Sequence, residues 1–258
     1  MVEFRKPLHK KVSILNHTTM KNKKSPLDIF LQKRIAENKE ILRQNFVSSL
    51  QEEQSCLEEI VKGINHCKSN IEICNKALDK ISILNMTVLK AKKEAFKDNL
   101  VIWNTIGHVQ MASIEMKRYA KALTLDSDNW KRQNNIKSAY TAIYETSKNL
   151  VDSTGKLIAF LNEKFPKYDI SLFKEVRKKL TKFRENKTET LTNVRNKIDA
   201  HRDKDVCVQI ETSENLHLAD AVKLIIDYMT IINELGKAVS PTKQKGIELL
   251  QNAFSERM

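Results

Sequence analysis

The chain has 258 residues, enough for one large domain or two small ones, and its 41% hydrophobic content can supply a sizeable core. Only 5 glycines and 4 prolines occur among abundant Lys, Leu, Ile, Asn and Glu, so we predict an all-α fold of long helices with few turns. The formal net charge of +13 predicts attraction to polyanions such as nucleic acid, an anionic membrane or an acidic partner.

The cysteines and the apolar segments indicate the compartment. Cys56, Cys67, Cys74 and Cys207 lack the C-x2-C pairs of zinc sites, and they suggest reduced thiols rather than a secreted disulfide scaffold. Residues 12–15 are too short for the apolar part of an export signal, and no uninterrupted apolar run approaches the ~18 residues of a transmembrane helix. We therefore expect a cytoplasmic protein with no membrane partner.

Residues 1–26 are predicted to form a basic flexible tail. The segment has few apolar residues, no helical period, and a single acid, Glu3, against seven basic residues. The sequence Ser25-Pro26 then predicts the start of a long helix, with the serine as N-cap and the proline at the first helical position.

Residues 27–125 are predicted to form a long helical hairpin or coiled-coil region. Apolar residues step in a 3-4 alternation, and such a seam requires a partner helix along its length. The seam consists of Leu57, Ile60, Ile64, Cys67, Ile71, Cys74, Leu78 and Ile81. The expected partner spans roughly 87–124, where the apolar residues are Phe96, Leu100, Trp103, Ile106, Met111, Ile114 and Leu123. No Gly or Pro occurs in 82–87, so a single rod that pairs with a second chain stays open.

Residues 126–240 are predicted to form a helical bundle, and residues 241–258 a short C-terminal helix. Turn and N-cap residues at 126–129 precede a helix that ends near Phe165-Pro166, and Trp130 is expected in its core together with Trp103. The next helix starts at Asp169 or Ser171, with an inner side of Phe173, Val176, Leu180, Phe183, Leu191, Val194 and Ile198. Residues 206–210 suit a short extended segment. Thr212 or Ser213 is expected to cap a last long helix, which contains Leu218, Val222, Ile225, Met229 and Ile232.

The residue types best suited to chemistry on a phosphodiester lie near the end of the helix that starts at 169–171. They are Arg195, Asn196 and His201. On a straight helix, residues six apart are rotated by roughly 120° and separated by ~9 Å, so Arg195 and His201 do not point together. A site contained within one chain is therefore not expected from this helix alone.

The spacing of Arg195, Asn196 and His201, with the flanking sequence Ala-His-Arg-Asp, resembles the R-N-x4-H signature of the HEPN superfamily, which includes RNA-cleaving toxins and abortive-infection proteins. The resemblance is specific over residues 194–205 and architectural over roughly 128–238. It implies a HEPN-like helical bundle, paired motifs at a homodimer interface, and metal-independent RNA cleavage without a cofactor. It also implies a toxin of antiphage defence or of a toxin–antitoxin system, with an antitoxin or another protein as partner.

The three motif residues have chemistry that suits this reaction. A neutral imidazole at His201 can take the ribose 2′-hydroxyl proton or protonate the leaving 5′-oxygen. Arg195 can clamp the phosphate and stabilise the charge that grows on its oxygens, and Asn196 can orient the phosphate or the histidine. In a two-fold symmetric dimer, a second Arg195 and His201 can complete the cleft. RNA is required, because its 2′-hydroxyl is the internal nucleophile.

Basic residues surround the motif. Residues 174–204 include eleven Lys and Arg against five Asp and Glu, which predicts a phosphate track leading to the cleft. The residues expected to bind RNA are Lys178, Lys182, Lys197, Arg202 and Lys204. The alternative interpretation is a solvated helix face.

Structural alternatives stay open for the motif and for the whole chain. Arg195 and Asp199 have the spacing of an ordinary i, i+4 ion pair, and His201 continues an apolar stripe. The chain as a whole also fits a non-catalytic helical scaffold that binds nucleic acid or a protein partner. Glu214 and His217 form one E-x-x-H pair, whereas carboxylate di-metal bundles use two, so no metal site is expected.

Overall fold

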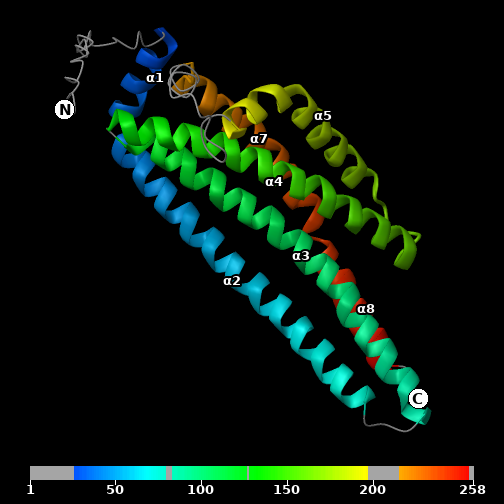
Figure 1. Ribbon diagram of the computed structural model, residues 1–258. Coiled ribbons are helices and arrows are strands. Elements are labelled where there is room, and N and C mark those ends of the chain that lie inside the picture. The colour runs from blue at the N-terminus through cyan, green and yellow to red at the C-terminus, as the bar shows by residue number, and fades with distance from the viewer. Residues whose placement is uncertain (1–25, 80–82, 127, 197–214, 256–258) are drawn as a thin grey trace, which may run out of the picture.

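The computed structural model describes residues 26–79, 83–126, 128–196 and 215–255 (Figure 1). Within these ranges the regular structure is helical and contains no strand, which confirms the predicted all-α bundle. The helices are α1 (Pro26–Glu37), α2 (Lys39–Leu78), α3 (Ile83–Leu125), α4 (Asn129–Lys164), α5 (Ser171–Val194), α7 (Leu218–Val239) and α8 (Thr242–Ser255). The basic tail, residues 206–210 and the capping candidates Ser25, Thr212 and Ser213 lie outside the described residues.

Helix α3 lies at the centre of the bundle. Helices α1, α2, α4, α7 and α8 all pack against it, and α5 packs on α4 and α7 (Figure 1). Ile102, Ala112, Met116 and Leu123 of α3 are 0% exposed, because neighbours cover successive faces of the helix. The continuous core built around α3 therefore fixes how α4 and α5, the helices that carry the candidate site, sit relative to each other.

Helix α2 folds back along α3 within the same chain, as the hairpin prediction requires (Figure 1). The seam faces α3: Ile60, Cys67 and Cys74 are buried, and the intervening seam residues are half-buried. Burial raises the pKa of the Cys67 thiol to about 11, so this side chain acts as a small apolar filler. The continuous rod left open by the sequence is not the arrangement in the described residues.

Polar and steric contacts set the register of the α2–α3 hairpin. The Glu53 carboxylate pairs with Lys117, whose side chain on α3 is only 22% exposed, and accepts a hydrogen bond of 3.0 Å from the Ser113 hydroxyl. Further along, Gly63 lets α2 approach Trp103 so closely that an added Cβ would lie 2.6 Å from the indole ring. Because a partly buried carboxylate needs its partners, sliding one helix along the other would be costly.

The inner stripe predicted for α5 is buried as expected from Phe173 to Val194. It joins α5 to α7 through Phe183, which stacks on Tyr228 with ring centroids 5.4 Å apart.

The core prediction is wrong for two residues: Met111 is 50% exposed and Trp130 is 70% exposed. Trp130 lies in the first turn of α4, ahead of the first buried residue of that helix, Ile136, and Lys137 covers its ring at 5.7 Å.

Two predicted helix boundaries also need correction. The helix expected to run from Pro26 through the seam is interrupted at Asn38, whose side chain donates a 2.9 Å hydrogen bond to the Arg34 carbonyl. The last long helix begins at Leu218, with His217 in the N-cap position, rather than directly after residues 212–213. Its cap comes from α1: the buried Asp28 carboxylate accepts a 2.9 Å hydrogen bond from the backbone N–H of Ala219. The break at Asn38 turns α1 toward α7 and allows this contact.

The Asp28 cap yields a test of the fold. We expect Asp28→Ala to lower the free energy of unfolding by about 1–2 kcal/mol, because the N-terminus of α7 loses its side-chain acceptor in a buried position. Urea denaturation followed by circular dichroism measures the loss. Asp28→Asn keeps a side-chain oxygen and should lie much closer to the wild type. Equal stability of Asp28→Ala and the wild type would contradict the capping role.

Candidate functional site

The structure describes the first half of the predicted catalytic motif. Arg195 and Asn196 directly follow Val194, the last residue of α5, and Arg195 keeps a helical backbone with φ −56° and ψ −49°. Lys178 and Lys182 are exposed on α5. The remaining predicted site residues lie outside the described part of the chain: Lys197, His201, Arg202 and Lys204.

The Arg195 guanidinium is held against α4. Its Nε donates a 2.6 Å hydrogen bond to Oε1 of Glu145, and its terminal Nη1 donates a 3.1 Å hydrogen bond to Oδ1 of Asn196. The ring of Tyr144 lies beneath it, with 5.1 Å from the guanidinium carbon to the ring centroid. Hydrogen bonds to two different side chains, together with the aromatic face of Tyr144, fix both the position and the plane of the guanidinium.

Glu145 and Tyr144 are site residues that the sequence did not indicate. They lie on α4, about 50 positions before Arg195, and no local motif links the two segments. Only the packing of α5 across α4 brings them together. The i, i+4 pairing of Arg195 with Asp199 involves a residue outside the described ranges, and the partner seen for Arg195 is Glu145.

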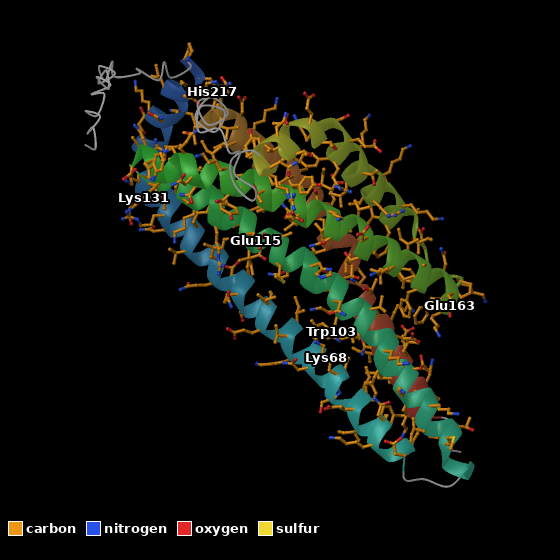
Figure 2. All side chains as sticks on the ribbon, in the orientation of Figure 1. Lys68, Trp103, Glu115, Lys131, Glu163 and His217 are labelled. Carbon is orange, nitrogen blue, oxygen red and sulfur yellow. The ribbon has the colours of Figure 1, made fainter. Side chains whose placement is uncertain are left out.

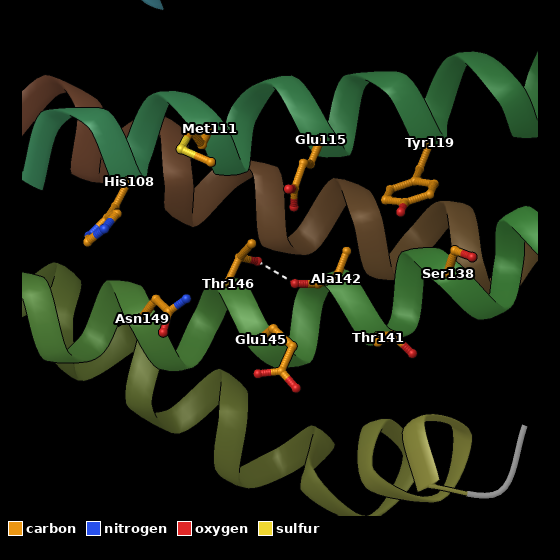
Figure 3. A pocket seen from close by; sticks show the side chains of 10 residues that line it. All are labelled: His108, Met111, Glu115, Tyr119, Ser138, Thr141, Ala142, Glu145, Thr146 and Asn149. Atoms are coloured by element: carbon orange, nitrogen blue, oxygen red, sulfur yellow. Dashed lines mark hydrogen bonds between the residues drawn. The ribbon is translucent and has the colours of Figure 1, made fainter. Parts of the chain in front are cut away.

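A groove of about 360 Å³ lies between α3 and α4 and includes Glu145 in its wall (Figure 3). It is lined by His108, Met111, Glu115, Tyr119, Ser138, Thr141, Ala142, Glu145, Thr146 and Asn149. Figure 3 shows His108, Glu115 and Tyr119 pointing from α3 toward α4. The Glu145 side chain points from α4 to the side that faces α5, away from α3 (Figure 3).

Burial shifts the protonation of groups that line or underlie the groove. Burial, reinforced by the positive charge of Lys156, lowers the pKa of His108 below its ordinary value. Burial raises the pKa of Glu115, and Arg118 partly opposes this effect. Tyr228, which donates a 2.9 Å hydrogen bond to Thr146 beneath the groove, has its pKa raised by burial and stays a neutral hydroxyl. Burial therefore favours the neutral forms of His108 and Glu115.

The basic face of α5 is only partly available to a ligand. Arg177 packs over Gly155 and donates a 3.2 Å hydrogen bond from Nε to the Val151 carbonyl, so it fastens α5 to α4. Lys179 pairs with Glu175 and Glu234 at 2.9 and 3.0 Å. The exposed Lys178 and Lys182 are the α5 members of the predicted RNA-binding set, and their exposure is compatible with either a phosphate track or a solvated face.

Among the described residues, no three His, Cys, Asp or Glu side chains gather into a group that could hold a metal ion. No helix of that same part of the chain combines the length and apolarity needed to cross a bilayer. No family model, curated protein or solved structure matches the chain.

The pKa of His108 gives a direct test of the groove. We expect an NMR titration to place it below the ordinary value for histidine, and Lys156→Gln to raise it by removing a neighbouring positive charge. Since the lowered pKa means that the unfolded chain binds this proton more readily, His108 should reduce stability as the pH falls below its ordinary pKa.

The control for this titration is Lys131→Gln, near the opposite end of α4 (Figure 2). Residues 131 and 156 are separated by ~37 Å along a helix, so this variant should leave the titration unchanged. An ordinary pKa for His108 in the wild type would contradict the assignment.

Proposed function

We propose that this protein is a metal-independent endoribonuclease of the HEPN type. The observation that carries the proposal is the contact between the Arg195 guanidinium and the Asn196 amide, fixed on the surface of α4 at the end of α5. A guanidinium held in a defined plane beside an amide suits recognition of a phosphodiester, because both groups donate hydrogen bonds to its oxygens. The residue pattern through His201 supplies the remaining acid–base group.

The reaction we propose is an internal transesterification. The ribose 2′-oxygen loses its proton and attacks the adjacent phosphorus, and the bond to the 5′-oxygen breaks as that oxygen gains a proton. Arg195 stabilises the negative charge on the non-bridging oxygens, and Asn196 orients the phosphate. His201 serves as an acid–base group. The products are a 2′,3′-cyclic phosphate and a 5′-hydroxyl end.

The biological setting proposed here is that of a cytoplasmic toxin in antiphage defence or in a toxin–antitoxin system, with RNA as substrate and an antitoxin or another protein as neutralising partner. We propose a homodimer, because a two-fold axis near the end of α5 would place two copies of the motif across one cleft. Neither copy then has to supply every group.

A second candidate is a non-catalytic helical scaffold that binds nucleic acid or a protein partner. The observation in its favour is that Arg195 is already bound within the chain, to Glu145 by an ion pair and to Tyr144 through the ring face. Such contacts also suit an arginine that only fastens α5 to α4. Cleavage assays separate the two functions.

The purified protein is expected to cleave RNA in the presence of EDTA and to leave DNA of the same sequence intact, because DNA lacks the 2′-hydroxyl. His201→Ala and Arg195→Ala should each reduce the rate by at least ~100-fold, the usual contribution of an acid–base or charge-stabilising group. Gel analysis of a labelled oligonucleotide measures the rate and identifies the cyclic phosphate end.

The matched controls are His66→Ala and Arg43→Ala, which alter exposed residues of α2 and should cleave like the wild type. Cleavage by His201→Ala at the wild-type rate would reject the enzyme and favour the scaffold. An absence of cleavage in the wild type, combined with salt-dependent RNA binding, would lead to the same conclusion.

The basic face of α5 gives a separate binding test. Replacing Lys178 and Lys182 together by alanine should weaken RNA binding and reduce the slope of log affinity against log salt by about one to two, because up to two phosphate contacts disappear. Fluorescence anisotropy at several salt concentrations measures the slope. Lys68→Ala and Lys131→Ala, introduced together at exposed positions of α2 and α4, provide the control, and an equal effect of both pairs would contradict a defined track (Figure 2).

A further inference from the structure

We infer that Glu145 is the general base of this site and that it removes the ribose 2′-hydroxyl proton; this inference rests on the proposed ribonuclease function. The sequence motif alone assigns acid–base chemistry to His201 and gives no role to α4. The structure adds a carboxylate whose Oε1 lies 2.6 Å from Nε of the motif arginine.

The location of Glu145 meets the geometric demand of the reaction. The attacking 2′-oxygen and the non-bridging oxygens surround the same phosphorus atom, so the base and the group that stabilises charge must be close neighbours. The Glu145 carboxylate and the Arg195 guanidinium are in direct contact. The Glu145 side chain is 45% exposed, so a ribose can approach it from solvent.

Arg195 can bind a phosphate while it holds Glu145. A guanidinium carries five N–H donors in one plane, and the contacts to Glu145 and Asn196 involve one hydrogen on Nε and one on Nη1. The same group can therefore bridge the base and the phosphate, and Tyr144 keeps its plane fixed during the reaction. The bridge orients the carboxylate toward the phosphate that Arg195 holds.

The proton balance is complete without a metal ion. The Glu145 carboxylate accepts the proton of the 2′-hydroxyl as the bond from the 2′-oxygen to phosphorus forms. The bond from phosphorus to the 5′-oxygen breaks, and that oxygen takes a proton from the general acid of the proposed mechanism.

The variant Glu145→Gln distinguishes a general base from a residue that only positions Arg195. The Gln amide keeps an oxygen that can accept the Arg195 hydrogen bond but cannot take up a proton at neutral pH. We expect Glu145→Gln to lower kcat by at least ~100-fold, with RNA affinity and the thermal unfolding midpoint close to those of the wild type. Its residual rate should rise by about tenfold per pH unit, because hydroxide then replaces the missing base.

A second variant, Glu145→Ala, provides a chemical rescue. It leaves space for a small carboxylate beside Arg195, so added formate should restore part of its cleavage rate. Formate should not restore cleavage by Glu145→Gln, in which the amide still fills the position. Glu163→Gln is the control, since Glu163 lies on the same helix near its far end and its side chain is 74% exposed (Figure 2).

The outcomes distinguish this inference from the proposed function. Wild-type cleavage by Glu145→Gln, with an unchanged pH profile, would overturn Glu145 as base and leave the ribonuclease standing. Loss of RNA affinity in step with loss of kcat would also overturn it, because Glu145 would then act only by positioning Arg195. If the wild type cleaves no RNA, the proposed function fails and the inference fails with it.

Discussion

Neighbouring helices bury α3 on several faces, and this packing holds the bundle together. Among the described helices, α1, α2, α4, α7 and α8 pack against α3, so segments from both halves of the chain cover its apolar residues. Helix α2 covers one side through its seam, α8 and α7 cover others, and α4 provides the support on which α5 lies (Figure 1). This packing fixes the geometry of the candidate site, because the site residues come from α4 and from the end of α5.

The contact of Arg195 with Glu145 shows that helix packing gives a motif residue partners that its own sequence segment does not contain. In the linear sequence, Arg195 is one member of a pair with His201, and helical spacing keeps the two apart. In the fold, Arg195 belongs to a cluster with Glu145, Tyr144 and Asn196. An ion pair with a 45% exposed partner adds little stability, so its main physical consequence is orientation of the guanidinium. Orientation is what recognition and stabilisation of a phosphate require.

Some predictions failed because a local pattern does not show which other segments pack against a residue. Trp130 has a large apolar side chain of the kind that usually lies in a core, but its position in the first turn of α4 leaves it at the surface. Met111 fits the apolar stripe of α3 and instead borders the groove, because the facing residues of α4 leave space there. The cap of α7 comes from Asp28, about 190 residues earlier, so no pattern close to residue 218 could reveal it. The helical propensity of neighbouring residues does not predict such contacts.

Local sequence patterns were enough to predict the all-α class, the seam of α2, the inner stripe of α5 and the turn before α4, where Asp128 accepts a hydrogen bond from the Lys131 backbone. These features depend on helical periodicity and on local capping, which neighbouring residues encode. The folded chain was needed to show that α2 folds back on α3, that α1 caps α7, and that Arg195 contacts Glu145. Each of those contacts joins segments separated by tens of residues, and the free energy of burying the common core, rather than any local preference, brings them together.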